Sequence, residues 1–201
     1  MRLAVLASGF GSNLQAILDA VGREEIAGEV KIVISDVESA YALERARINS
    51  IESVHLNPRH YNSREDFDNI IADLLTQRHI ELIILAGYMR LLSSQFVQKF
   101  EGRIINIHPA LLPAFPGLNG VQKALAHGVK VSGCTVHFVD EGLDTGPIIL
   151  QEAVPVLDGD TEESLHERIH EVEHRLYPRA IQLFIEGKLR LKGRRCVRVE
   201  E

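Results

Sequence analysis

The sequence is poor in cysteine, in positive charge and in long apolar runs. Its 201 residues include 2 cysteines, Cys134 and Cys196, which lie far apart and have no CxxC spacing. Such sparse cysteine is typical of a protein in a reducing compartment. We therefore expect a cytoplasmic protein.

The charges are not those of a nucleic-acid or membrane binder. Lys and Arg number 22 against 28 Asp and Glu, which gives a net charge of −6. This balance disfavours nonspecific binding to nucleic acid or anionic membranes. No apolar run approaches the roughly 20 residues that span a bilayer. The opening "MRLAVLASG" has one Arg and a short apolar run, which predicts a first strand and not a signal peptide.

Several motifs of other chemistries are also missing. The sequence has no GxxxxGK[ST] triphosphate loop and no GxSxG nucleophile motif. It has no internal repeat and no linker-like stretch. Its composition, 45% hydrophobic and 25% charged, is ordinary for a chain that buries a core. We expect one domain over residues 1–201.

Apolar runs alternate with helical patterns in the first half of the chain. Continuous apolar runs of this length predict strands buried on both faces of a parallel sheet, and apolar stripes predict the helices between them. This order predicts an α/β sheet whose ligands bind at the carboxyl ends of the strands. The predicted strands are 2–8, 31–36 and 80–87, and the predicted helices are 12–24, 41–50 and 63–79.

The second half contains less helix. Segments 102–109, 132–139 and 146–156 predict strands, so we expect a mostly parallel, twisted sheet with an antiparallel strand. A long helix is predicted over 160–187, with Asp160 as its cap and with Pro178 kinking or breaking it. Segment 188–199 predicts a terminal hairpin around Gly193.

"SGFGSN" (8–13) follows the first strand and opens the first helix. Free N–H groups at a helix N-terminus bind phosphate, and Ser12 and Asn13 can add hydrogen bonds. One alternative is a dinucleotide site, which would need the motif GxGxxG, but its third glycine is replaced by Leu14. In favour of this alternative, Asp36 ends the second strand, where an acid that binds the ribose of a dinucleotide would lie. A tight turn without a ligand is a further alternative. A site for a single phosphate fits best.

"NIHPALLPAFPG" (106–117) ends an apolar strand with polar residues. Side chains two apart on a strand point to the same side, so Asn106 and His108 should project together at the ligand edge. Asn can donate to a developing oxyanion, and His can carry a proton near neutral pH. The alternative is that both merely satisfy backbone groups at the strand end.

Asp144 lies in the loop "DEGLDTGPI" (140–148), where an Asp is commonly a turn former. Near His108 it would favour the imidazolium and raise the pKa of His108. Because no obvious nucleophile accompanies these residues, the pattern favours direct attack by a substrate nucleophile.

Two other charged features have plainer interpretations. His166, His170 and His174 are four residues apart on one helix face and could bind a metal, but we interpret them as an exposed face with no metal. The basic residues of 188–199 are interpreted as a solvated edge, with a nucleic-acid patch as the alternative.

Taken in order, "SGFGSNLQAI", "AGYMRLL", "NIHPALLPAFPG" and "DEGLDTGPIILQ" resemble the phosphoribosylglycinamide formyltransferases, folate-dependent enzymes of purine biosynthesis. The resemblance covers essentially the whole chain. Methionyl-tRNA formyltransferase and formyltetrahydrofolate hydrolase share NIHP…LLP, but the SGxGSN loop favours the glycinamide ribonucleotide enzyme. The resemblance implies a three-layer α/β/α formyltransferase fold, with a phosphate-binding Rossmann-like half (1–100) and a catalytic and folate half (101–201).

The resemblance also implies roles for individual residues. The substrates would be glycinamide ribonucleotide and 10-formyltetrahydrofolate, with no metal, and the protein would be a monomer or homodimer. Asn106, His108 and Asp144 would be catalytic. The ribonucleotide phosphate and ribose would be held by Gly11, Ser12, Asn13 and Glu173. The folate would be held by Arg64, Met89, Arg90, Leu91, Leu92, Asp140, Glu141 and Asp144.

One stretch departs from the family pattern. After Pro116 and Gly117 the family usually has a His near position 119, whereas this sequence reads "LNGVQKAL" with Asn119, Gly120 and Val121. Any secondary role of such a histidine is therefore in question here. Two other functions remain open from the residues alone: a nucleotide-dependent oxidoreductase, and a non-catalytic phosphate-binding module.

Overall fold

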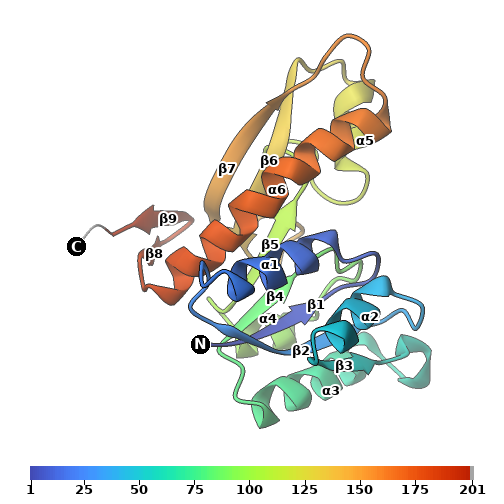
Figure 1. Ribbon diagram of the computed structural model, residues 1–201, viewed down its shortest axis with the longest axis vertical. Coiled ribbons are helices and arrows are strands. Elements are labelled where there is room, and N and C mark those ends of the chain that lie inside the picture. Colours follow the sequence, from blue (N-terminus) through green and yellow to red (C-terminus); the bar gives the residue numbers. More distant parts are fainter. Residues whose placement is uncertain (200–201) are drawn as a thin grey trace. The chain divides into compact units, whose positions relative to one another are not determined.

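The structure, a computed structural model, describes residues 1–199 (Figure 1). It contains two compact units that divide between Ile105 and Asn106. The strands of the main sheet follow the order β3-β2-β1-β4-β5-β6-β7, with β6 and β7 antiparallel. The α/β class and the mostly parallel sheet with an antiparallel strand are confirmed.

The first unit is built on parallel strands whose apolar side chains are buried on both faces. β1 pairs with both β2 and β4, and β2 pairs with β3, all in parallel. Leu3, Val5 and Ile84 are fully buried, as expected for interior parallel strands. The strands are β1 (Arg2–Leu6), β2 (Glu29–Ser35), β3 (Glu52–His55) and β4 (Leu82–Leu85). The helices are α1 (Ser12–Gly22), α2 (Tyr41–Ile48), the 3-10 turn η1 (Pro58–His60), α3 (Arg64–Gln77) and α4 (Ser94–Lys99).

Helix α3 begins where its sequence predicts. The Ser63 side chain accepts a hydrogen bond of 3.0 Å from the Asp66 backbone N–H, which satisfies a free donor of the first turn. Phe67 and Ile71 face the core and are buried, whereas Ile70 is 38% exposed. Because β3 and α4 are only 4 and 6 residues long, their patterns are too short to predict.

The second unit holds the later strands and one long helix. β6 and β7 form an antiparallel pair, and α6 packs against both strands (Figure 1). No helix within residues 1–199 is long and apolar enough to cross a membrane. The elements are β5 (Ile104–His108), whose first residues belong to the first unit, α5 (Gly120–Ala126), β6 (Val131–Phe138), β7 (Ile148–Pro155), α6 (Glu162–Ile185), β8 (Leu189–Lys192) and β9 (Arg195–Arg198).

Helix α6 corrects the expected cap and excludes the break expected at Pro178. Its cap is Thr161 and not Asp160: the Thr161 side chain accepts from the Ser164 N–H, and Ser164 Oγ accepts from the Thr161 N–H. Asp160 pairs instead with Arg168. Pro178 does not break the helix, which continues to Ile185. Pro178 is itself buried, so packing of the helix face outweighs the one backbone hydrogen bond that a proline removes.

Candidate functional site

Asn106 and His108 end strand β5 as the sequence predicts. Their positions alternate with the buried Ile105 and Ile107, so the two polar side chains share a side of the strand. His108 is only 5% exposed. A histidine this deeply buried needs partners for both ring nitrogens.

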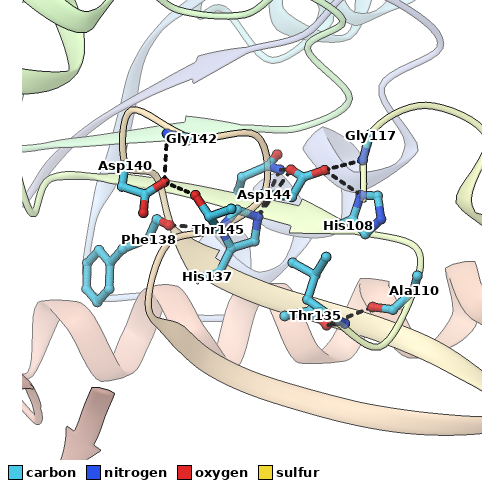
Figure 2. A network of polar contacts seen from close by, with 12 residues as sticks. His108, Ala110, Gly117, Thr135, His137, Phe138, Asp140, Gly142, Asp144 and Thr145 are labelled. Carbon is cyan, nitrogen blue, oxygen red and sulfur yellow. Dashed lines mark hydrogen bonds and ion pairs between the residues drawn. The ribbon is translucent and has the colours of Figure 1, made fainter. Parts of the chain in front are cut away.

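Asp144 lies in the loop between β6 and β7. Asp140 shapes this loop, because its Oδ1 accepts hydrogen bonds from the Gly142 N–H (3.1 Å) and the Thr145 hydroxyl (2.7 Å) (Figure 2). Asp144 itself has a φ of 54°, an uncommon value for a residue other than glycine. The Asp140 carboxylate is thus used inside the loop, while Glu141 is exposed.

The structure brings the three predicted catalytic residues together. Asp144 Oδ2 accepts a 2.7 Å hydrogen bond from the Gly117 N–H and lies 3.4 Å from His108 Nδ1. Asp144 Oδ1 accepts a longer bond, 3.5 Å, from Asn106 Nδ2. Figure 2 shows Asp144 between His108 and His137, with Gly117 on the His108 side.

His137 on β6 is a member of this cluster that the sequence reasoning missed. Its Nδ1 lies 2.8 Å from the Phe138 carbonyl oxygen, which can only accept, so Nδ1 carries a proton. Its Nε2 faces both Asn106 Nδ2 (3.2 Å) and Asp144 Oδ1 (3.6 Å). It can therefore accept from the amide when neutral and donate to the carboxylate when charged. The signal was the alternation in 132–139, which puts Thr135 and His137 on one face just before the Asp144 loop.

His108 keeps one donor in either charge state. Its Nε2 lies 2.8 Å from the Phe115 carbonyl oxygen and must therefore carry the proton of the neutral ring. The second proton would enter at Nδ1, beside Asp144. Gly120 lies in the stretch where this sequence departs from the family pattern. A Cβ at this position would lie 3.3 Å from His108 Nε2, so the glycine leaves room beside that nitrogen.

Burial and nearby charges shift the pKa values of His108 and Asp144 in opposite directions. Burial lowers the pKa of His108 below its usual range, although Asp144 and the Phe115 carbonyl act to raise it. The expected effect of Asp144 is therefore present but is outweighed by desolvation. Burial would raise the pKa of Asp144, but its hydrogen bonds with His137 and the Gly117 N–H, and the charge of His108, hold it below the usual range.

Thr135 anchors the loop that follows His108. Its hydroxyl donates to the Ala110 carbonyl (2.7 Å) and accepts from the Leu112 N–H (3.0 Å) and Gln151 Nε2 (2.9 Å). Gln151 Nε2 also lies 2.8 Å from the Leu112 carbonyl. Because Thr135 is fully buried and its hydroxyl makes all three of these bonds, the backbone after His108 is fixed to β6.

The predicted phosphate loop lies at the start of α1, in the first unit. Gly11 precedes the helix with a φ of 75°, and a Cβ there would lie 2.9 Å from Ala42 Cβ. Ser8 Oγ donates to Asp36 Oδ1 (2.6 Å) and accepts from the Met89 N–H (2.9 Å). Asp36 thus braces the loop, which gives no support to its reading as the ribose-binding acid of a dinucleotide site.

The segment 89–92 of the first unit, which is predicted to bind the folate, exposes large apolar side chains. Met89 is 64% and Leu91 57% exposed, while Leu92 is half-buried. The Arg90 guanidinium lies 5.1 Å from the centre of the Phe67 ring. Arg64, at the start of α3, is exposed and 3.7 Å from Glu65.

The histidine row of α6 is more buried than predicted. His166 is exposed, but His170 and His174 are half-buried, and the buried Nε2 of His174 has no hydrogen-bond partner. Within residues 1–199, no group of three His, Cys, Asp or Glu residues is placed to hold a metal ion. Glu173, the predicted ribose contact, is 2% exposed and pairs with His170.

The basic hairpin β8–β9 is largely solvated, as predicted, but one residue makes a specific contact. Arg194 Nη2 donates a 3.1 Å hydrogen bond to the Thr145 carbonyl oxygen, next to Asp144. The hairpin therefore touches the Asp144 loop in addition to forming an edge. The exposed basic residues are Arg190, Lys192, Arg194, Arg195 and Arg198.

Comparison with known proteins now identifies the family. Residues 1–181 match the family model described as formyl transferase. The chain belongs to the formyl transferase family. It is 45% identical over 181 residues to phosphoribosylglycinamide formyltransferase of Bacillus subtilis, covering 90% of this chain and 93% of that protein.

Solved structures of formyl transferases agree. The chain resembles the crystal structure of glycinamide ribonucleotide transformylase 1 from Symbiobacterium toebii, with a TM-score of 0.98, 54% identity, and coverage of 100% of this chain and 94% of that one. Other relatives are much longer: the chain is 49% identical over 191 residues to the trifunctional purine biosynthetic protein adenosine-3 of Drosophila pseudoobscura pseudoobscura. That match covers 94% of this chain but only 14% of the relative.

Proposed function

We propose that this formyl transferase moves a formyl group from 10-formyltetrahydrofolate to the amine of phosphoribosylglycinamide, a step of purine biosynthesis. The observation that carries the proposal is the convergence of Asn106, His108 and Asp144 in one buried cluster. The choice of acceptor is supported by the high identity to the Bacillus subtilis enzyme over nearly its whole length.

The phosphate loop supplies the first part of the acceptor site. The N–H groups of Gly11, Ser12 and Asn13 lie at the N-terminus of α1, where the helix dipole favours an anion. The positive φ of Gly11 allows the turn, and the absence of a side chain allows its close approach to Ala42. Glu173 would accept hydrogen bonds from the ribose hydroxyls.

The residues proposed for the folate suit its chemistry. A folate combines a flat ring system with an acidic tail. Met89, Leu91 and Leu92 offer apolar surface, and Arg64 and Arg90 offer cations that pair with carboxylates. In the second unit, backbone groups of the loop 140–144, which Asp140 holds in shape, would bind the ring through hydrogen bonds.

Asn106 and His108 would stabilise the charge that develops on the formyl oxygen as the substrate amine attacks. Nδ2 of Asn106 and the N–H at His108 Nε2 are the donors, and the latter is present even in the neutral ring. His108 would exchange its Phe115 partner for the formyl oxygen. Each such donor typically contributes about 100- to 1000-fold in rate.

Asp144 would act as the charge partner of His108. The second proton of His108 enters at Nδ1, 3.4 Å from Asp144 Oδ2, so the imidazolium that could protonate the leaving folate nitrogen is stabilised in place. Because the pKa of Asp144 is held low, its carboxylate remains charged near neutral pH.

A turnover assay tests the proposal. Purified protein given glycinamide ribonucleotide and 10-formyltetrahydrofolate should release tetrahydrofolate and formylated ribonucleotide in equal amounts. A matched reaction without ribonucleotide should release little, which separates transfer from simple hydrolysis of the folate. Absence of turnover across a range of pH, or tight binding of NAD without affinity for folate, would contradict the proposal.

Four properties remain predictions. We expect residues 1–201 to behave as one domain whose halves, 1–100 and 101–201, bind phosphate and perform catalysis, respectively. We expect a cytoplasmic enzyme that is a monomer or homodimer and uses small-molecule substrates only. Cooperative unfolding seen by two probes would test the single domain, and the mass measured by light scattering would test the oligomeric state.

A further inference from the structure

The carboxylate of Glu173 forms a buried ion pair on α6. Its Oε2 lies 2.7 Å from Nδ1 of His170, one turn earlier on the same helix face. The Glu173 side chain is 3% exposed and that of His170 is 33% exposed. A buried carboxylate is costly without a charged partner, and His170 supplies one that solvent can protonate.

His170 lies in the middle of the histidine row, between His166 and His174. Its ring lies 4.1 Å from that of His166 and 5.7 Å from that of His174, measured between centroids. Burial, followed by the charge on His170, lowers the pKa of both neighbours. The hydrogen bond to Glu173 raises the pKa of His170. Of the three rings, His170 is therefore the one whose protonation its surroundings favour.

Other titrating groups also face Glu173. Glu173 raises the pKa of His108 on β5, though less than burial lowers it. Burial, and then Glu173, raises the pKa of the Cys134 thiol on β6 to about 12, which keeps that thiol neutral. Among these groups, His170 makes the hydrogen bond of 2.7 Å to Glu173. The titrating groups that feel the charge of Glu173 include His108, Cys134, His166, His170 and His174.

We propose that His170 is a positioning residue for the ribonucleotide: when protonated it holds Glu173 in the orientation that receives the sugar hydroxyls, and it weakens that hold when it loses its proton. The inference rests on the proposed function, which assigns the ribose to Glu173. The pair is fully present below the ordinary pKa of a histidine, about 6.5, and weakens as pH rises through the raised pKa of His170. A neutral His170 still donates from Nδ1, so we expect affinity to fall about fivefold, the difference between a charged and a neutral hydrogen bond.

Binding calorimetry across pH tests this inference. Glycinamide ribonucleotide would be titrated into the wild type, His170→Gln and His166→Gln from about pH 6 to about pH 9, the range in which a raised histidine titrates. Glutamine donates a hydrogen bond at every pH but carries no charge. His166→Gln is the matched control, because His166 lies in the same row without a hydrogen bond to Glu173. Titration of the ligand itself is common to all three proteins and cancels in the comparison.

We expect Kd to rise with pH about fivefold more in the wild type and in His166→Gln than in His170→Gln. In NMR titrations of the ring, Glu173→Gln should lower the pKa of His170, which also checks the pair if a variant folds poorly. Equal pH dependence in His170→Gln and wild type, or an unchanged ring pKa in Glu173→Gln, would overturn the inference alone. A wild type that never binds the ribonucleotide would overturn the proposed function as well.

Discussion

Replacing Asp144 with asparagine removes a charge at the centre of the cluster while keeping the shape of the side chain. In the wild type, the two oxygens accept from the Gly117 N–H and from Asn106 Nδ2, at 2.7 and 3.5 Å, and face His108 and His137. An asparagine has one oxygen and one NH2 group, so one of the two donors would face another donor. The charge that stabilises His108 as an imidazolium would also be lost.

The magnitude follows from these contacts. Hydrogen bonds to charged groups contribute about 1.5–3 kcal/mol each, and a misplaced oxyanion donor costs about 100- to 1000-fold in rate. We therefore expect kcat of Asp144→Asn to fall about 100- to 1000-fold. The Kd for glycinamide ribonucleotide should change little, since its phosphate site is the loop at Gly11. The melting temperature should fall by a few degrees, as for a lost buried hydrogen bond.

The assay is steady-state formyl transfer, with calorimetric binding of the ribonucleotide and thermal unfolding measured on the same samples. Asp158→Asn is the matched control, because the Asp158 side chain is 94% exposed and pairs across the surface with Lys130. Such surface pairs contribute about 0–1 kcal/mol, so this variant should keep its kcat and its stability. A folded Asp144→Asn protein with kcat within about threefold of wild type would refute the reasoning, because a donor set of this kind is worth far more.

Three further predictions follow from other contacts. Gly11→Ala should weaken ribonucleotide binding at least tenfold, roughly the cost of one misplaced contact, because Gly11 has a positive φ and approaches Ala42 closely. Gly22→Ala is the control and should not weaken binding, because the space around Gly22 is open. Equal Kd values for the two variants in a binding titration would count against the phosphate loop. Thr135→Val should lower the free energy of unfolding, measured by urea denaturation, by about 1–3 kcal/mol, because the buried partners of the hydroxyl are left unsatisfied. A change of only about 0.3 kcal/mol would contradict the anchoring role of Thr135. The pKa of His108, measured by NMR, should lie below about 6.5 and fall further in Asp144→Asn. Because folding depresses the pKa of His108, the stability that this group contributes is present above about pH 6.5 and is lost as pH falls through the folded pKa. A measured pKa of His108 above about 6.5 would contradict the dominance of burial.

Local sequence patterns predicted most of the elements near the site. The alternation in "RIINIHP" predicted a strand that ends with Asn106 and His108 on one side, and β5 ends at His108. The start of α3 was also predicted, at residue 63, because the cap that Ser63 forms depends on residues three apart in sequence. Long-range contacts were not predictable in this way. Asp160 could have capped α6, but its pairing with Arg168 left that role to Thr161.

The sequence by itself determined the α/β class, the strand that carries Asn106 and His108, and the motifs that point to formyl transfer. These depend on apolar periodicity and on spacing within a few residues. Only the tertiary structure decided that His137 joins the cluster, that Thr135 fixes the loop after His108, and that burial outweighs Asp144 in setting the pKa of His108. Each of these depends on side chains that are far apart in sequence, and on how much water the folded chain excludes around them.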